Sequence, residues 1–311
     1  MKIRANEVDI EVEDTAISHP ETADKPVALL IMGLGMQLIA WPPEMVQGLV
    51  DAGYRVVRFD NRDVGLSSKL DSLGKPHLLW ASIKYKLGLA VRSPYSLSDM
   101  AADTLGVLDA LGIARAHVVG VSMGGMIAQR VALAAPQRVL SLTSIMSTSG
   151  ARGLPQASNA VIKAMISRPK GKDMQAAVAH TVRLFQTIGS PGFPMPEADI
   201  RARVEAGVQR SFSPVGTMRQ MVAVVADMTR AAQLIRVTSP TLVIHGKADP
   251  LVPYACGEDT ARRIPGARLV GFDGLGHDLP PVPVAQMLTE LIPHLRAADG
   301  RARPTAASTT P

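Results

Sequence analysis

The chain has 311 residues, of which 47% are apolar and 19% charged, a balance that is ordinary for a folded globular protein with a sizeable core. Its formal net charge is +6, but the excess is local: residues 150–236 carry 12 Lys and Arg against 5 Asp and Glu. Aromatic residues make up only 4% and no base-reading motif accompanies the basic stretch, so we expect no nucleic-acid partner. The stretch indicates either a solvated helical face or a weak attraction for anionic ligands.

Three further features bear on location. Residues 1–14 contain no apolar segment, which argues against a signal peptide, and no window of about 18 residues is apolar enough to span a membrane. Cys256 is the only cysteine, so an internal disulfide is excluded. It is also a weak candidate for a catalytic thiol, because its neighbours Gly257 and Glu258 include no activating base. We therefore expect a cytoplasmic protein without an integral membrane segment.

In chain order, residues 1–14 predict an antiparallel hairpin at a sheet edge, and six short apolar runs then predict buried strands. These runs are 27–32, 54–59, 117–121, 139–145, 240–245 and 268–272. Helical patterns between and after them span 43–52, 98–111, 123–134 and 284–294. Gly53 and Gly112 are typical helix stops, and Ser98 is expected to cap the start of its helix. Strands alternating with helices predict a mostly parallel sheet covered on both faces.

The alternation stops at residue 149 and resumes after 236. Within this stretch, prolines separate three or four expected helices, around 157–167, 173–187, 197–209 and 215–234. A helical insertion between two strands predicts a cap over one end of the sheet. We therefore expect a core formed by 1–148 and 237–296, a helical cap formed by 149–236, and a disordered polar tail at 297–311.

Residues 120–124 (GVSMG) place Ser122 between an expected strand and an expected helix. The bare pattern is weak, but the strand-to-helix context strengthens it. A turn this sharp needs glycines on either side of the serine, because Cβ atoms there would collide with neighbouring elements. The turn directs the hydroxyl outward at the carboxyl end of the sheet. Ser122 is therefore the candidate nucleophile.

A serine hydroxyl is nearly inert at neutral pH unless a base accepts its proton. His277 is the best candidate for this base, because it follows the last expected strand within a glycine-containing loop, residues 273–276. Four other histidines fit the role less well: His117, His180, His245 and His294.

The base in turn needs a carboxylate that holds it in one tautomer. Asp249 follows the strand at 240–245, whereas the alternative position after the preceding strand, residues 147–150, has no carboxylate. Three other carboxylates are less suitable, since they lie in a helix or too close to the histidine in sequence: Asp259, Asp273 and Asp278. The chain order Ser, Asp, His is typical of the α/β-hydrolase fold, a mostly parallel sheet flanked by helices, here with a helical cap.

An ester carbonyl under attack develops negative charge on its oxygen, which backbone N–H groups can stabilise. The loop after the first parallel strand, residues 31–35 (IMGLG), contains two glycines that allow close approach of the backbone. We expect the N–H groups of Leu34 and Met123 to form this oxyanion hole.

Three runs resemble the α/β-hydrolases around aclacinomycin methylesterase: 58–67 (RFDNRDVGLS), 120–125 (GVSMGG) and 276–280 (GHDLP). The resemblance covers residues 22–296, and the DNRD and HDLP runs are its more selective part. It implies a carboxylic ester hydrolase that acts on a small-molecule ester and needs neither cofactor nor metal. Met32 departs from the superfamily pattern, in which a histidine often precedes the glycine, but this family tolerates the change.

The expected cap contains nine larger apolar side chains: Met165, Met174, Met195, Met218, Met221, Met228, Phe185, Phe193 and Phe212. Most should form the core of the cap. Any methionine that lines the pocket favours adaptable binding of short- to medium-chain esters, methyl esters included.

Other functions of the same triad stay open at this point, namely a cofactor-free haloperoxidase or perhydrolase and a carbon–carbon bond hydrolase. Dehalogenases and most epoxide hydrolases of this fold are excluded, because they need an aspartate in place of Ser122. A non-enzymatic ligand receptor is disfavoured, since every triad position is filled. Residues 80–89 (WASIKYKLGL) are interpreted as a connecting helix near the site entrance rather than a membrane contact. A homodimer is left open.

Overall fold

The computed structural model describes residues 1–167, 169, 171 and 173–300. Its centre is an eight-stranded sheet in the order β1-β2-β4-β3-β5-β6-β7-β8. The strands are β1 (Lys2–Ala5), β2 (Val8–Asp14), β3 (Val27–Ile31), β4 (Arg55–Phe59), β5 (Ala116–Val121), β6 (Val139–Ile145), β7 (Thr241–Gly246) and β8 (Arg268–Phe272). All neighbours from β4 to β8 are parallel, so the expected strands and the mostly parallel sheet are confirmed.

The expected N-terminal hairpin is also confirmed. β1 pairs with β2 in antiparallel register, and the turn between them has positive φ at Asn6 and Glu7. β2 continues the sheet by antiparallel pairing with β4, with Val12 opposite Phe59. The hairpin therefore extends one edge of the parallel sheet.

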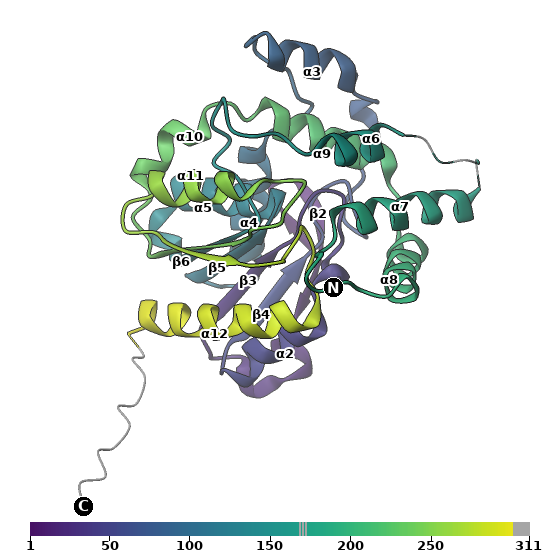
Figure 1. Ribbon diagram of the computed structural model, residues 1–311. Helices are drawn as coiled ribbons and strands as arrows, with labels where there is room; N and C mark the ends of the chain where they lie inside the picture. Colours follow the sequence, from purple (N-terminus) through teal and green to yellow (C-terminus); the bar gives the residue numbers. More distant parts are fainter. Residues whose placement is uncertain (168, 170, 172, 301–311) are drawn as a thin grey trace, which may run out of the picture.

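Helices cover both faces of the sheet, as the buried strands require. On β3, Val27, Leu29 and Ile31 contribute to a core shared with α4 (Leu97–Ala110) and α5 (Met123–Ala134). Ala28 and Leu30 point to the other face, where α2 (Pro43–Asp51) and α12 (Pro281–Ala298) pack. Figure 1 shows α2 and α12 on one side of the sheet and α5 with α11 (Tyr254–Arg263) on the other. The remaining short elements of the core are α1 (Thr15–Ser18), α3 (Leu78–Lys86) and the 3-10 helices Pro20–Thr22, Leu38–Ala40, Asp71–Leu73 and Pro136–Arg138.

Two expected boundaries are wrong. The N-cap of α4 is Ser96 rather than Ser98, because the Ser96 hydroxyl accepts from the Asp99 N–H and Asp99 reciprocates in a capping box. α12 continues to Ala298, so the first residues of the expected disordered tail are helical. Asp299 follows as an acceptor for the Tyr54 hydroxyl at 3.0 Å, which ties this end to the core. The rest of that tail, residues 301–311, lies outside the described part of the chain.

The segment between β6 and β7 is helical, as expected, and we call it the cap below for brevity. It contains α6 (Asn159–Ile166), α7 (Met174–Ile188), α8 (Glu197–Arg210), α9 (Pro214–Ala226), α10 (Arg230–Gln233) and the 3-10 helix Leu234–Arg236. The single helix expected at 215–234 is wrong in its middle, because α9 ends at Ala226. There the carboxylate of Asp227 pairs with Arg130 of α5 and with Arg230. None of the helices in the described ranges is both long and apolar enough to cross a membrane.

Candidate active site

The turn between β5 and α5 holds Ser122 in a strained conformation, with φ 54° and ψ −120°. Two glycines make this turn sterically feasible. A Cβ on Gly120 would collide with the backbone of Gly124, and a Cβ on Gly124 would collide with the carbonyl group of Ile31. The turn therefore places the Ser122 hydroxyl at the carboxyl end of the parallel strands, directly before the N-terminus of α5.

Three side chains expected from the sequence meet at this point. His277 Nε2 lies 3.0 Å from Ser122 Oγ, and His277 Nδ1 lies 2.7 Å from Asp249 Oδ2. The residues follow β5, β8 and β7, whose carboxyl ends share one edge of the sheet. In this geometry Asp249 accepts the Nδ1 proton, which leaves Nε2 free to accept the proton of the serine hydroxyl.

The carboxylate of Asp249 is held from several sides. Its Oδ1 accepts from the N–H groups of Leu251 at 2.9 Å and Val252 at 2.8 Å. Burial alone would raise the pKa of Asp249, but the charge of His277, the nearby ring of His245 and hydrogen bonds from His277 and Val252 lower it to about 2. Asp249 is therefore ionised at neutral pH and can stabilise a protonated His277.

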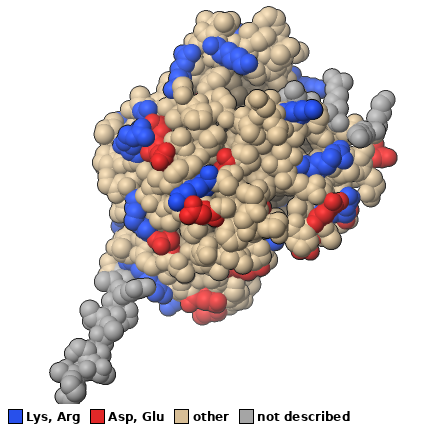
Figure 2. All heavy atoms as spheres, in the orientation of Figure 1, with Lys and Arg blue, Asp and Glu red and all other residues tan. Residues whose placement is uncertain are grey.

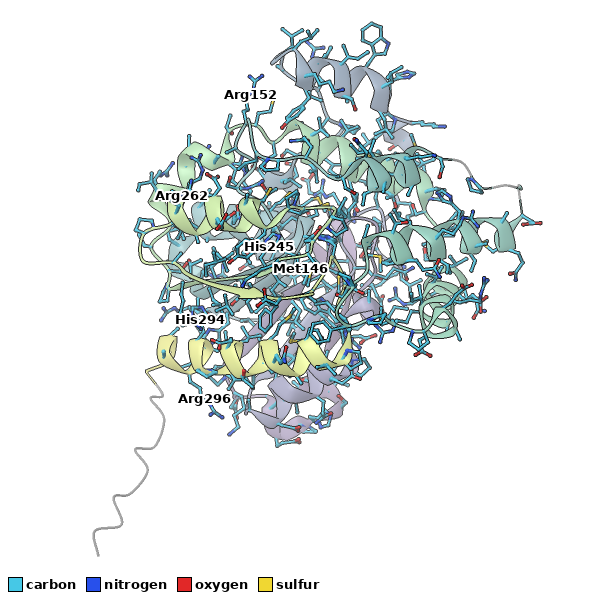
Figure 3. All side chains as sticks on the ribbon, in the orientation of Figure 1. Met146, Arg152, His245, Arg262, His294 and Arg296 are labelled. Carbon is cyan, nitrogen blue, oxygen red and sulfur yellow. The ribbon has the colours of Figure 1, made fainter. Side chains whose placement is uncertain are left out.

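The alternative histidines do not reach Ser122. His245 Nε2 donates to the carbonyl oxygen of Val252 at 2.7 Å, and its ring packs against Gly257. Figure 3 shows it beside Met146 at the ends of β7 and β6, whereas His294 lies on α12 across the sheet. His245 thus supports the loop that carries the acid.

The alternative carboxylates have other partners. Asp259 accepts from Ser149 and Arg263, each at 2.5 Å, and Asp273 is an exposed partner of Lys247. Asp278 forms a short hydrogen bond with the hydroxyl of Ser190, and burial raises its pKa. The carboxylate that contacts His277 Nδ1 is instead that of Asp249.

The loop of His277 is held by the cap, through a residue that the sequence did not reveal. The Ser190 hydroxyl accepts from the Gly276 N–H at 2.8 Å and also contacts Asp278. The His277 N–H donates to the carbonyl oxygen of Ile188 at 2.7 Å. Ser190 follows α7 and carries no motif, so its role appears only when the cap is packed on the core.

The expected oxyanion loop also contacts the cap. Gly33 packs so closely on Ser122 that a Cβ there would lie 3.2 Å from the Ser122 Cβ, and Leu34 follows it. The Gly35 N–H donates to Gln220 Oε1 at 2.8 Å, while Gln220 Nε2 donates to the carbonyl oxygen of Arg62, also at 2.8 Å. Gln220 is fully buried on α9 and is a second residue that sequence reasoning missed. Met123 begins α5 beside the nucleophile, at the helix end where N–H groups are free.

The DNRD run ties core and cap together by charge. Asp60 accepts from Arg210 of α8 at 2.6 Å, and Asp63 forms a two-pronged pair with Arg219 of α9 at 2.7 and 2.8 Å. Arg62 pairs with Asp103 of α4 inside the core. Burial would raise the pKa of Asp63. Hydrogen bonds from Arg219 and from the Leu70 N–H, together with the charge of Arg219, lower it below its ordinary value.

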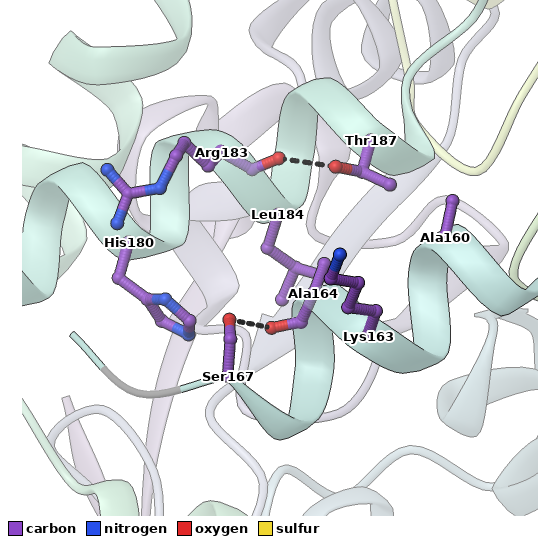
Figure 4. A pocket seen from close by; sticks show the side chains of 8 residues that line it. All are labelled: Ala160, Lys163, Ala164, Ser167, His180, Arg183, Leu184 and Thr187. Atoms are coloured by element: carbon purple, nitrogen blue, oxygen red, sulfur yellow. Dashed lines mark hydrogen bonds between the residues drawn. The ribbon is translucent and has the colours of Figure 1, made fainter. Parts of the chain in front are cut away.

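These pairs explain part of the basic excess in the cap, since two of its arginines neutralise core aspartates. Arg230, another of them, is buried and pairs with Asp227. On the face shown in Figure 2, Lys and Arg side chains are spread out rather than gathered in one patch. A cavity of about 340 Å³ between α6 and α7 is lined by Lys163, His180 and Arg183 among other residues (Figure 4). No residue of the candidate triad lines it, so His180 lies apart from Ser122. Among the residues described, no cluster of three or more His, Cys, Asp or Glu side chains could hold a metal ion.

Comparison with known proteins agrees with this architecture. The pattern of the family described as alpha/beta hydrolase fold matches residues 26–281. The chain is 31% identical over 300 residues to rhodomycin D methylesterase DnrP of Streptomyces peucetius, covering 89% of this chain and 93% of that protein. It is 29% identical to a putative carbamate hydrolase RutD of Variovorax paradoxus, covering 77% of this chain and 80% of that protein.

Among solved structures, a meta-cleavage product hydrolase from Pseudomonas fluorescens IP01 superposes with a TM-score of 0.72. The alignment covers 96% of this chain and 98% of that one, at 19% identity. This likeness concerns the fold alone.

Proposed function

This chain belongs to the α/β-hydrolase fold family, and from that premise we propose that it hydrolyses carboxylic esters through an acyl-enzyme on Ser122. The observation that carries the proposal is the unbroken hydrogen-bond chain from Asp249 through His277 to Ser122. The relationship to a methylesterase over most of both chains supports an ester as the substrate.

The proposed reaction has two halves. His277 Nε2 takes the Ser122 proton as Oγ attacks the ester carbonyl, and the N–H groups of Leu34 and Met123 stabilise the oxyanion. When the carbonyl re-forms, the C–O bond to the alcohol breaks and His277 returns the proton to the leaving alcohol. Water then attacks the acyl-enzyme by the same route, releasing the acid and free Ser122.

For the substrate, we propose esters with a small alcohol, methyl esters among them, and a short- to medium-chain or medium-sized apolar acyl group. The methylesterase relative supports the small alcohol. For the compartment we propose the cytoplasm, where a free cysteine such as the buried Cys256 stays a thiol. We propose no nucleic-acid partner, and the proposed reaction is compatible with a homodimer.

The test is a panel of p-nitrophenyl and methyl esters of increasing acyl length, assayed with wild type and Ser122→Ala. We expect turnover that favours short to medium chains, loss of activity in the variant, and labelling of wild type but not the variant by a fluorophosphonate probe. Ser72→Ala, at an exposed serine, is the matched control and should behave like wild type. Perhydrolysis or carbon–carbon cleavage without ester turnover would contradict the proposal.

A further inference from the structure

Helix α3 and the turn after it project from the body of the protein beside α9, far from the sheet (Figure 1). Several large apolar side chains on it are exposed: Leu79 at 74%, Trp80 at 64% and Leu87 at 68%, together with Ile83 and Leu89. Single exposed apolar residues are ordinary, but a run of five on one projecting element is a contiguous patch.

The positions of these residues show that the patch is one face of the helix. At about 100° per residue, Leu79, Ile83, Leu87 and Trp80 fall within one arc of about 100°. Ala81 and Tyr85 lie on the opposite side, where Ala81 is buried and α3 packs on α9. The helix is thus apolar on both sides, and only the inner side is covered within the part of the chain that the structure describes.

Basic residues border this outer face. Lys84 and Lys86 fall on either edge of the apolar arc, and Lys75 and Arg92 flank the helix in sequence, all four exposed. Residues 72–98 contain no Asp or Glu. A fifth cation, Arg152, lies against Gly88 at the end of the helix, and Figure 2 shows this projection with blue but no red atoms.

We propose that this α3 patch, formed by Leu79, Trp80, Ile83, Leu87 and Leu89 with Lys75, Lys84, Lys86 and Arg92, docks the protein on an anionic lipid surface. An apolar arc bordered by lysines suits the boundary between head groups and acyl chains, because the apolar side chains insert while the ammonium groups reach the phosphates. Tryptophan is favoured at the same depth. A second copy of the chain is the poorer occupant, since a twofold pairing of this face would bring its lysines together without a carboxylate to receive them.

The chain carries its own reporter for this contact. It has two tryptophans, of which Trp41 is fully buried and Trp80 is largely exposed. Titrating the full-length protein with vesicles of phosphatidylcholine and phosphatidylglycerol should therefore shift the Trp80 emission to shorter wavelength. Vesicles of phosphatidylcholine alone should give little shift, and high salt should reverse the binding. Co-sedimentation of the protein with the vesicles provides an independent readout.

Variants separate the two parts of the patch. Lys84→Gln with Lys86→Gln should weaken binding to anionic vesicles about 25-fold, at roughly fivefold per basic residue near the surface. Leu79→Ser with Leu87→Ser should abolish the emission shift at the same lipid concentration. Ile235→Ser, at an apolar residue exposed to 65% elsewhere, is the matched control and should bind like wild type. Circular dichroism checks that each variant is folded.

Three results would overturn the proposal. The first is equal binding to neutral and anionic vesicles, and the second is no binding to either. The third is a concentration-dependent dimer that Leu79→Ser with Leu87→Ser dissociates, which would make a second copy the occupant of the patch. None of these outcomes depends on whether Ser122 turns over an ester.

Discussion

The strand-end loops of the core and the cap helices that pack on them use buried charge differently. In the core loops, Asp249 is a buried acid whose charge faces His277 and the reacting serine. In the cap, Arg210 and Arg219 are cations whose charges face core aspartates and touch no part of the candidate triad. The first arrangement supplies chemistry, whereas the second fixes one part of the molecule to another. Variants that remove each kind of charge should therefore lose different properties.

The largest effect is expected at the acid of the core loops. Asp249→Asn keeps the shape of the side chain but lets His277 adopt the wrong tautomer, so kcat should fall about 10⁴-fold. Steady-state kinetics on a p-nitrophenyl ester measures this loss. Asp273→Asn, at an exposed carboxylate four residues before His277, is the control and should change kcat little. A small loss in Asp249→Asn would mean that another group orients His277.

The next effect concerns the cap and is a loss of stability rather than of chemistry. Arg219→Met leaves Asp63 buried without its partner, which should lower the free energy of unfolding by about 3–5 kcal/mol. Denaturant unfolding measures the change. Arg201→Met removes an exposed arginine that pairs with Glu197 and Glu205, and should cost less than about 1 kcal/mol. Equal losses of unfolding free energy in the two variants would show that the buried pair of Arg219 and Asp63 stabilises the protein no more than an exposed pair does.

Gln220 joins the two regions, because it belongs to the cap but holds the oxyanion loop. Gln220→Leu removes the acceptor for the Gly35 N–H and should lower kcat about 10- to 100-fold, a smaller loss than direct removal of an oxyanion donor. KM should change less than kcat, since the loss concerns the transition state. Gln220→Glu keeps the acceptor and should recover part of the rate.

A matched buried amide distinguishes positioning from simple destabilisation. Gln129 is equally buried and bonds Ser144 and Arg230 away from the oxyanion loop. Gln129→Leu should lower the melting temperature while leaving kcat near the wild-type value. If both variants lost kcat to the same degree, Gln220 would be a structural residue without a particular effect on the loop.

The smallest effect tests burial of a titratable group far from both regions. Burial lowers the pKa of His294 on α12 to about 4, below its ordinary value near 6.5. The folded state thus keeps His294 neutral while the unfolded state takes up a proton as the pH falls. Between pH 7 and 5 this should remove about 2 kcal/mol of stability. Unfolding of His294→Leu should show a weaker pH dependence over this range, and His77→Leu, at an exposed histidine, should follow wild type.

Much of the core could be predicted from the sequence because its signals are local. The apolar runs gave the strands, and the glycines around Ser122 together with the loop positions of Asp249 and His277 indicated which side chains would meet. The cap–core contacts could not be predicted in this way. Ser190 and Gln220 act through partners 86 and 185 residues away, and no periodicity or motif marks such pairs.

The errors in helix boundaries have a similar origin. Asp227 interrupts the helix expected at 215–234, because its carboxylate is held by Arg130 from another element. Ser98 fits the pattern of an N-cap, but the helix begins earlier, where Ser96 and Asp99 form reciprocal hydrogen bonds. An ion pair between two elements set the first boundary and a capping box set the second, and single-residue preferences predict neither.

One inserted segment forms hydrogen bonds with both loops of the candidate site. Ile188 and Ser190 bond the histidine loop, and Gln220 bonds the oxyanion loop. The reactive geometry is therefore only as durable as that segment. On warming, catalytic activity should be lost when the inserted segment unfolds locally, at a temperature at which the central sheet is still folded.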